Sequence, residues 1–483
     1  MLFSSVEFLC AFLPFTLLVY YLLPGRRLRN HFLLLMSLFF YAWGEPLYVL
    51  LMLTCIVGNY AFGLLAAAFH DSAGRWPSRL NLAAMLVFNL GLLAVYKYSS
   101  FVISNLNSAF GLNLADPGFV LPIGISFFTF QGMSYVLDVY RGQAQARLNV
   151  LDVGLYVAFF PQLIAGPIVR YNTIAAEIDG RREKWQDFAA GVDLFIIGLG
   201  KKVLLANNFA LVVDKILDSG TYVYAQEMSV AAAWAAAIGY TLQIYFDFSG
   251  YSDMALGLGR MFGFHFLPNF NYPYIARSVT DFWRRWHISL SSWFRDYVYI
   301  PLGGNRVGKQ RLVLNLLLVW LLTGLWHGAN WTFIVWGLYY FCFLTLEKLT
   351  GLNKLLAKIP LVGNVFTLFV VIIGWVIFRS SDLPSALQHI GLMFGLYNNP
   401  LTDEIFIYQL LENRVHLAVA LLACLPLVPA IKSLCQRFKV QVGRGWLGAP
   451  LGIVRDGVLL VVLVLVLAAL AKGSYNPFIY FNF

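Results

Sequence analysis

The residues best suited to chemistry in this sequence are two of its seven histidines, His287 and His327. His287 lies among tryptophans and arginines in the segment 282–296 (FWRRWHISLSSWFRD), and His327 lies in an apolar stretch that has no other acidic or basic side chain. A neutral imidazole is a natural general base for a hydroxyl group, because it exchanges protons near neutral pH. An ionisable residue inside a membrane segment is also a functional candidate by default. We therefore expect His327 and His287 to be catalytic.

Each of these histidines also has a structural alternative. A buried histidine such as His327 can bond to a backbone carbonyl across a helix contact. His287 lies among residues that suit a membrane interface, where tryptophan rings and guanidinium groups meet water. The other five histidines lie near loop boundaries or the ends of apolar segments, and we expect them to be structural or interfacial: His31, His70, His265, His389 and His416.

A second polar island, 245–253 (YFDFSGYSD), ends an apolar run and contains Asp247 and Asp253. These carboxylates are candidates to pair with Arg284 or Arg285, or to hold a histidine ring in one tautomer. The alternative is a structural ion pair within the membrane. The sequence has no HExxH, His-x-x-His or Cys-x-x-Cys pattern, so it predicts no metal site.

The composition requires that membrane helices hold these residues. Of the 483 residues, 60% are hydrophobic and 12% are charged, whereas a soluble globular chain has about 25% charged residues. Since a span needs about 20 mostly apolar residues, we expect roughly 11–14 membrane segments. We interpret the first apolar run, Val6–Leu23, as a span and not as a cleavable signal, because no basic stretch precedes it. The sequence therefore predicts an all-α, polytopic membrane protein with a single domain over residues 1–483.

The basic excess agrees with this interpretation. The formal net charge is +10, and the basic residues occur in short loops between apolar runs. Such loops follow the positive-inside rule, whereas a nucleic-acid-binding protein concentrates its basic residues on one face. Arg26, Arg27 and Arg29 follow the first apolar run, so we expect that loop to be cytoplasmic. The sequence thus predicts a membrane and not a nucleic acid as the partner.

The stretch Leu312–Leu346 must contain a break. It has no acidic or basic side chain apart from His327, and as one helix it would be about 52 Å long, compared with about 30 Å for the hydrocarbon core. Gly324 and the segment 328–330 (GAN) are the natural break points. Irregular backbone at membrane depth occurs only where protein or a water-filled cavity surrounds it. We therefore expect His327 to lie at a break, and to line a cavity or a packed pocket if that break is within the bilayer.

Several segments occur in an order that resembles a known family. They are 121–127 (LPIGISF), 160–167 (FPQLIAGP), 245–255 (YFDFSGYSDMA), 281–291 (DFWRRWHISLS), 299–306 (YIPLGGNR) and 323–331 (TGLWHGANW). Together they resemble the bacterial branch of the membrane-bound O-acyltransferase (MBOAT) family, and most closely its alginate O-acetyltransferase membrane subunits. The resemblance covers nearly the whole chain, becomes loose after about Ser380, and has its motif-bearing core at about residues 120–348.

The resemblance implies many helices, some re-entrant or broken, around a central tunnel. It maps the two family histidines onto His287 and His327, and His327 is the one that the family treats as essential. Trp326 and Asn330 belong to the same motif and are expected to support it. The resemblance also implies acetyl-CoA as a cytoplasmic acyl donor, with no bound cofactor. The basic segment Arg277–Arg311, which includes Arg284 and Arg285, is expected to face the phosphates of this donor.

The expected function is transfer of acetyl groups across the bacterial cytoplasmic (inner) membrane for O-acetylation of an extracytoplasmic polysaccharide such as alginate. Family members usually act with a separate extracytoplasmic partner of the SGNH-hydrolase type. A sister group transfers D-alanine to teichoic acids, so a different acyl group is one alternative. A transporter or flippase of a polar solute would also explain a polar midsection and a buried histidine. A scaffold subunit of an export complex is the third possibility, and it predicts that His327 is dispensable.

Overall fold

The computed structural model describes residues 1–483 except 71–74, 165, 218–226, 438–447, 474 and 480–483. The described residues form helices joined by loops, and they contain no strand, which confirms the all-α prediction. The helices of the N-terminal half are α1 (Leu13–Leu22), α2 (Arg26–Gly44), α3 (Val49–Ala68), α4 (Arg75–Leu93), α5 (Ser99–Phe110), α6 (Ile125–Tyr140), α7 (Val150–Ala158), α8 (Phe160–Leu163), α9 (Tyr171–Gly180), α10 (Trp185–Gly200) and α11 (Asn207–Leu217).

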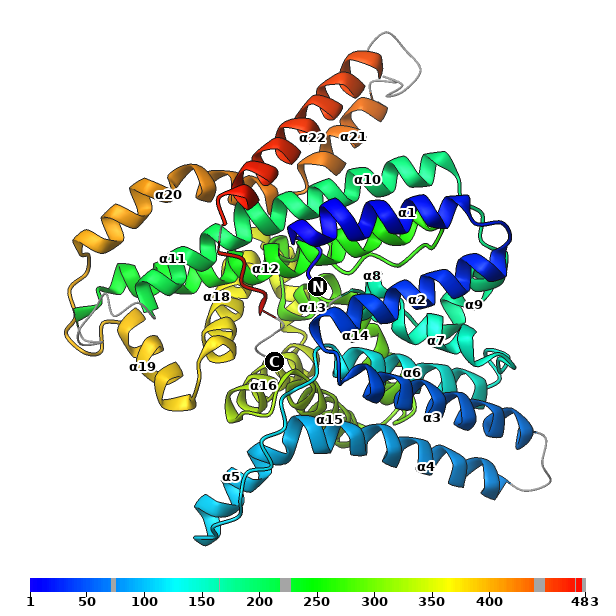
Figure 1. The fold of residues 1–483 in the computed structure, drawn as a ribbon. Helices are drawn as coiled ribbons and strands as arrows, with labels where there is room; N and C mark the ends of the chain where they lie inside the picture. The colour runs from blue at the N-terminus through cyan, green and yellow to red at the C-terminus, as the bar shows by residue number, and fades with distance from the viewer. Residues whose placement is uncertain (71–74, 165, 218–226, 438–447, 474, 480–483) are drawn as a thin grey trace.

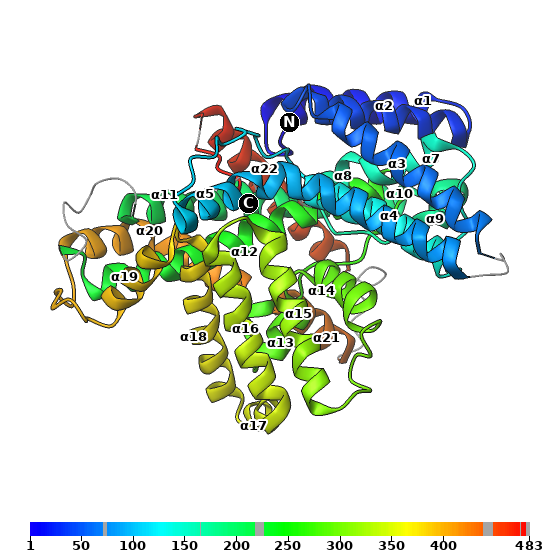
Figure 2. The ribbon, with the colours of Figure 1, turned by 90° about the horizontal axis from the view of Figure 1, so that it is seen from below.

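The C-terminal half begins with the longest helix, α12, and it ends with α22. Its helices are α12 (Val230–Met261), α13 (Val279–Arg285), α14 (Ile288–Phe294), α15 (Lys309–His327), α16 (Trp331–Thr350), α17 (Leu352–Lys358), α18 (Pro360–Arg379), α19 (Leu383–Met393), α20 (Glu404–Ala423), α21 (Leu427–Arg437) and α22 (Gly448–Ala471). Figure 1 shows α10, α11 and α12 crossing the molecule, with α1–α4 at the right of the view and α18–α20 at the left. Figure 2 shows α15, α16 and α18 projecting from the layer that contains α2, α4 and α10.

Helix α12 forms the centre of the fold, and small residues bring α10 close to it. A Cβ added at Gly198 of α10 would lie 2.5 Å from the carbonyl oxygen of Gly250, and one added at Gly257 of α12 would lie 2.5 Å from that of Gly191. These distances are too short for any side chain, so only glycine allows the two backbones to approach. Small residues serve the same purpose at many membrane helix contacts. The result is a tightly packed α10–α12 pair on which the other helices assemble.

Six helical segments of the described chain are long and apolar enough to cross a membrane. They are Val49–Ala68, Trp76–Phe110, Trp331–Thr350, Pro360–Arg379, Glu404–Ala423 and Gly452–Ala471. The first predicted span appears as a shorter apolar helical segment, Phe8–Leu22. Six is fewer than the predicted 11–14 segments. Some helices, such as α6 with 16 residues, are too short to be counted, and the long helix α12 carries polar side chains that are buried against other helices. The chain is therefore a multi-pass membrane protein in which polar faces are turned inwards.

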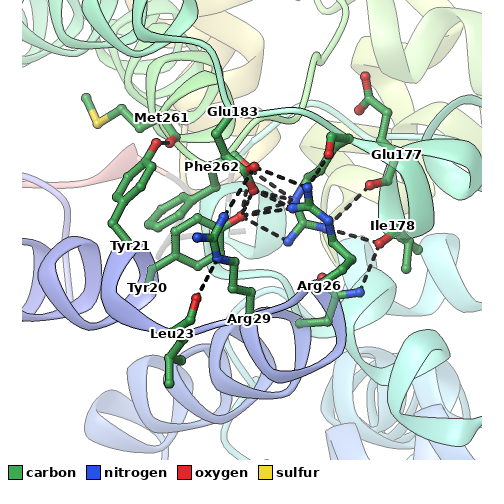
Figure 3. A network of polar contacts seen from close by, with 12 residues as sticks. Tyr20, Tyr21, Leu23, Arg26, Arg29, Glu177, Ile178, Glu183, Met261 and Phe262 are labelled. Carbon is green, nitrogen blue, oxygen red and sulfur yellow. Dashed lines mark hydrogen bonds and ion pairs between the residues drawn. The ribbon is translucent and has the colours of Figure 1, made fainter.

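A polar network ties the first two helices to the loop between α9 and α10 (Figure 3). The Glu183 carboxylate accepts hydrogen bonds from Tyr20 and Arg26, and Arg181 donates to the hydroxyl of Tyr20 and to the carbonyl of Phe262 at the end of α12. Burial by itself raises the pKa of Glu183, but the hydrogen bonds from Arg26 and Tyr20 outweigh it and lower the pKa to about 2. Ion pairs and hydrogen bonds, in addition to packing, thus connect the N-terminal helices to the end of the central helix.

Candidate active site

His327 lies at the predicted break. It is the last residue of α15, and the chain turns through the extended residue Gly328 before Asn330 caps α16. The stretch thus folds as a helical hairpin whose turn is at residues 328–330. Gly324 stays helical instead, and a side chain there would collide with the carbonyl of Phe333 on the facing helix. The break within Leu312–Leu346 is therefore confirmed, and its position is the second of the two predicted points.

The His327 ring is enclosed by aromatic side chains. It is 7% exposed, and its ring centroid lies 4.9 Å from that of Trp326, 5.0 Å from Trp336 and 5.2 Å from Phe378. Its Nδ1 atom is buried and has no hydrogen-bond partner among the described residues. The structural alternative needs a ring nitrogen bonded to a backbone carbonyl, and the described part of the chain provides no such bond. An unpartnered buried imidazole nitrogen is unusual, and it suits a group that meets a substrate.

His287 lies at a second helix break, between α13 and α14. It is 1% exposed and has a left-handed backbone with φ +44°, a conformation that costs energy for a residue other than glycine and that tends to occur at functional sites. Its Nδ1 atom lies 3.2 Å from Oδ1 of Asn269. That same oxygen accepts hydrogen bonds from the backbone N–H of Ser289 at 3.1 Å and from its hydroxyl at 2.9 Å.

These contacts fix the tautomer of His287. The backbone N–H of Ser289 can only donate, so the atom of Asn269 that faces it must be the amide oxygen. An oxygen accepts, so Nδ1 of His287 carries the hydrogen and donates it. The other nitrogen, Nε2, then holds a lone pair, and it is buried with no partner in the described chain. His287 is thus oriented as a base with a free nitrogen.

Both histidines line one cavity of about 220 Å³. The Trp326 ring contacts both of them, with its centroid 6.0 Å from that of His287. The cavity also reaches three basic residues, Arg284, Arg295 and Lys348. Arg295 pairs with Asp296, and Lys348 donates to the hydroxyl of Tyr299 at 3.0 Å. The two imidazoles therefore share a largely apolar cavity that is partly open and has exposed basic residues in its lining.

A second and larger cavity lies next to Phe378, whose ring contacts that of His327. It has a volume of about 770 Å³ and a lining that is about half polar. Phe378 contacts the ring of His327 and also lines this cavity, so its ring separates the two spaces. The predicted residue Asn330 lines it as well and donates to the carbonyl of Ser381 at 2.7 Å. Tyr475 and residues 477–479 form part of the wall, so the C-terminal part of the chain, for which the sequence suggested no role, contributes to the site.

Lys97 is a site residue that the sequence analysis missed. Its ammonium group donates to the carbonyl of Trp326 at 2.6 Å, to that of His327 at 3.1 Å and to the hydroxyl of Ser126 at 3.3 Å. Lys97 lies in a π-helical turn, Ala94–Tyr98, between α4 and α5, and such turns are frequent at functional sites. A positive charge near the last carbonyl groups of a helix stabilises that helix end, and here the Lys97 ammonium group takes this place at the end of α15. The available signal was a lone lysine deep inside a long apolar segment.

Asp247 and Asp253 do not pair with the arginines or with a histidine, and the alternative prediction of structural ion pairs is confirmed. Asp247 forms an ion pair with Lys202 at 2.6 Å and accepts the backbone N–H of Ile479 at 2.9 Å. Asp253 pairs with Lys201 at 2.6 Å. The physical reason is helix packing, because α12 lies against the end of α10 and the turn that follows it, and two lysines are at that position. The carboxylates hold the fold and the C-terminal tail, and an asparagine orients His287 instead.

The two arginines predicted to bind the donor have different surroundings. Arg284 lines the cavity of the two histidines. Arg285, one residue further on, instead pairs with Asp281 at 2.9 Å on its own helix and donates to the carbonyl of Asn271 at 3.3 Å. Consecutive residues of a helix point about 100° apart, so only one of the two can face the cavity.

Comparison with known proteins gives the family. The family described as MBOAT, membrane-bound O-acyltransferase, matches residues 143–379. The chain is 40% identical to the probable alginate O-acetylase AlgI of Pseudomonas putida over 100% of both chains. It is 44% identical to the protein of the same name from Pseudomonas syringae over 82% of this chain and 75% of the relative. It is 37% identical to the peptidoglycan O-acetyltransferase of Helicobacter pylori over 82% of this chain and 80% of the relative.

These matches decide between the alternatives left open by the sequence. A transporter, a flippase or a scaffold would explain the buried polar residues, but none of them accounts for a relationship over most of the chain to proteins named as acyl-transferring enzymes. The cavity with its two imidazoles is in accord with this activity. The chain belongs to the membrane-bound O-acyltransferase family and is a multi-pass membrane enzyme that transfers an acyl group to a hydroxyl group.

Proposed function

We propose that this enzyme takes acetyl groups from acetyl-CoA on the cytoplasmic side of the bacterial inner membrane and passes them on for O-acetylation of an extracytoplasmic, alginate-type polysaccharide. One observation carries the proposal: each of two buried histidines has an unpartnered ring nitrogen, and both rings line a cavity with a basic rim. The names of the relatives support the acetyl group and the polysaccharide acceptor.

The properties of the smaller cavity support acetyl-CoA as the donor. Coenzyme A carries phosphate groups, and Arg284, Arg295 and Lys348 at the rim are suited to bind them. A volume of about 220 Å³ has room for the thioester end of the donor and a short acyl group. A long fatty acyl chain would need considerably more space. The cavity therefore favours acetyl over long-chain donors.

The chemistry follows from the free nitrogen atoms. In the proposed direct reaction, His327 removes the proton from the acceptor hydroxyl, and the oxygen attacks the thioester carbonyl. The C–O bond forms, the C–S bond breaks, and the coenzyme A thiolate takes up the proton. His287, oriented by Asn269, assists by accepting or relaying a proton through Nε2. In a dry site, such hydrogen bonds act more strongly than in water. A covalent acetyl-histidine step is the alternative route.

The larger cavity supports an acceptor site on the opposite side. Its lining includes hydroxyl and amide side chains such as Ser380, Ser385 and Gln388, which suit a hydroxyl-bearing acceptor. Phe378 separates this cavity from His327, so we propose that its ring moves to let the acceptor hydroxyl reach the base. A separate extracytoplasmic protein of the SGNH-hydrolase type would then complete transfer to the polysaccharide.

The proposal is tested by transfer of labelled acetyl from acetyl-CoA in membranes that contain wild-type protein, His327→Ala or the control His31→Ala at matched levels. We expect His327→Ala to be inserted normally but inactive, and His31→Ala to be active, because His31 lies outside both cavities. If His327→Ala retains full activity, the site assignment is wrong. Label that stays on the protein after quenching without acceptor would indicate the covalent route.

Arg284 and Arg285 offer an internal comparison for the donor side. Arg284→Gln removes a cation from the cavity rim, and we expect the KM for acetyl-CoA to rise about fivefold, the effect of one charged contact of roughly 1 kcal/mol. Arg285→Gln removes a cation that is held by Asp281 outside the cavity, and we expect the KM to stay unchanged. Equal effects of both substitutions would contradict the donor-side assignment.

A further inference from the structure

The outer surface of the molecule carries a long apolar groove beside α20, which we call the α20 groove. It consists of two adjoining hollows. One, of about 350 Å³, lies between α11, α12 and α20, and the other, of about 610 Å³, lies between α12, α18 and the end of α20. Both hollows are lined by Ile238 and Leu242 of α12, so they join into one groove. Its lining is almost wholly apolar, and neither histidine of the active site takes part in it.

The position of the groove relative to the candidate spans indicates its depth in the membrane. Pro360, the first residue of α18, lines one end, and Leu425, two residues beyond the end of α20, lines the same hollow. Both helices are candidate spans, so this end lies where two spans meet the membrane surface. From Pro360 to Ile372, both of which line this hollow, α18 rises about 18 Å, close to half of a hydrocarbon core of about 30 Å. The hollow thus extends through about one leaflet.

A basic group stands at the surface end of the groove. Arg277 lines it and is exposed. Its backbone N–H is bonded to Asp281, but its guanidinium group has no partner in the described chain. The backbone of Arg277 packs against Gly363, as does that of Leu356 in α17, and α17 carries two exposed lysines, Lys354 and Lys358, and no acidic residue. The carboxylate of Asp281 is already paired with Arg285.

Three polar side chains that line the groove already donate hydrogen bonds within the protein. Asn364 donates to the carbonyls of Tyr274 and Ala276, Asn413 donates to Gln409, and the hydroxyl of Thr241 donates to the carbonyl of Ala237. A peptide strand or loop would bring unpaired N–H and C=O groups into this apolar space and would find few partners. A hydrocarbon chain needs none. The groove therefore suits an amphiphile with a long apolar part and a single anionic head.

We propose that the α20 groove binds an anionic phospholipid, with one acyl chain against Ile238 and Leu242 and the phosphate on Arg277. The lipid would also explain how α20 is held. Only 11% of the residues in the apolar stretch of α20 are buried, and the groove lies between this helix and its neighbours α12 and α18. A chain that fills the groove packs between these helices and fastens α20 to the protein.

The test uses the purified full-length protein in detergent, with phosphatidylglycerol or phosphatidylcholine of the same acyl chains added. Binding is measured by native mass spectrometry, and the Tm is followed by intrinsic fluorescence. We expect tighter binding and a larger rise in Tm with phosphatidylglycerol. Arg277→Gln should weaken phosphatidylglycerol binding about fivefold, the effect of one basic residue at a lipid headgroup. The control is Arg27→Gln, which should leave this binding unchanged. Arg27 is an exposed arginine on another helix, far from the groove in the sequence.

A second variant tests the apolar part of the groove. Ile238 is 39% exposed, so Ile238→Trp can fill the groove without disrupting the core. We expect it to abolish the Tm rise with both lipids. Equal binding of the two lipids by the wild type would overturn the proposal, as would unchanged phosphatidylglycerol binding by Arg277→Gln. These readouts do not depend on acetyl transfer, so the result is independent of the proposed function.

Discussion

The orientation of His287 by Asn269 gives the sharpest prediction. Asn269→Ala removes one oxygen that accepts three hydrogen bonds, from Nδ1 of His287 at 3.2 Å, from the N–H of Ser289 at 3.1 Å and from its hydroxyl at 2.9 Å. The ring nitrogen and the backbone N–H are then left buried without an acceptor, at a cost of about 1–3 kcal/mol each. We therefore expect the free energy of unfolding to fall by roughly 2–6 kcal/mol, which a lower Tm in detergent will report.

Activity should fall for a separate reason. The bond from Nδ1 to Asn269 stabilises the tautomer that leaves Nε2 free, and a net hydrogen bond of about 1 kcal/mol corresponds to a fivefold change in population. Loss of ring position adds to this, so we expect acetyl transfer to fall at least fivefold. Asn269→Asp is the matched control, because a carboxylate of the same size still accepts from all three donors. We expect it to keep most of the activity.

The assay is acetyl transfer from acetyl-CoA per folded molecule, with the amount of folded protein taken from size-exclusion chromatography. Normalisation separates the effect on stability from the effect on the ring. If folded Asn269→Ala is as active as the wild type, His287 does not act through an oriented Nε2. A folded but inactive Asn269→Asp would also contradict the reasoning, since it preserves the acceptor.

Three further outcomes follow from the structure. Lys97→Met removes the cation from the last carbonyls of α15. We expect kcat to fall about tenfold or more through misplacement of His327, with little change in the KM for acetyl-CoA. An unchanged kcat with a rise in KM alone would contradict this role. The pKa of Glu183 is lowered to about 2 from a usual value of 4.5, so the contribution of Glu183 to stability is complete above about pH 4.5 and is lost as the pH falls towards 2. In Tm measurements between pH 7 and 3, Glu183→Gln should lower the Tm at pH 7 and flatten the dependence of the Tm on acid pH. The exposed control Glu412→Gln should do neither. Gly324→Leu should abolish folding, because its side chain would collide with the backbone of Phe333, and a normal yield of this variant would refute the close α15–α16 contact.

The sequence by itself determined the class of protein and the positions of its irregular backbone. Composition required membrane helices, since few charged residues and recurrent apolar runs cannot form a soluble core. The apolar stretch around His327 was too long for one span, so a break was necessary, and glycine indicated where. Both histidines stood out because an ionisable group within apolar or aromatic surroundings is costly. These are local properties, and local patterns of hydropathy and glycine are sufficient to find them.

Only the tertiary structure decided which side chains meet. Asn269 lies 18 residues before His287, Lys97 lies 230 residues before His327, and Asp247 binds a backbone group 232 residues away. Nothing in the sequence indicates these pairs, because they depend on how the helices pack. The arginines considered as partners of Asp247 were wrong for this reason, since any nearby cation can satisfy a buried carboxylate. Side-chain type therefore limits the kind of partner that a buried polar group needs, and packing in three dimensions selects the residue that provides it.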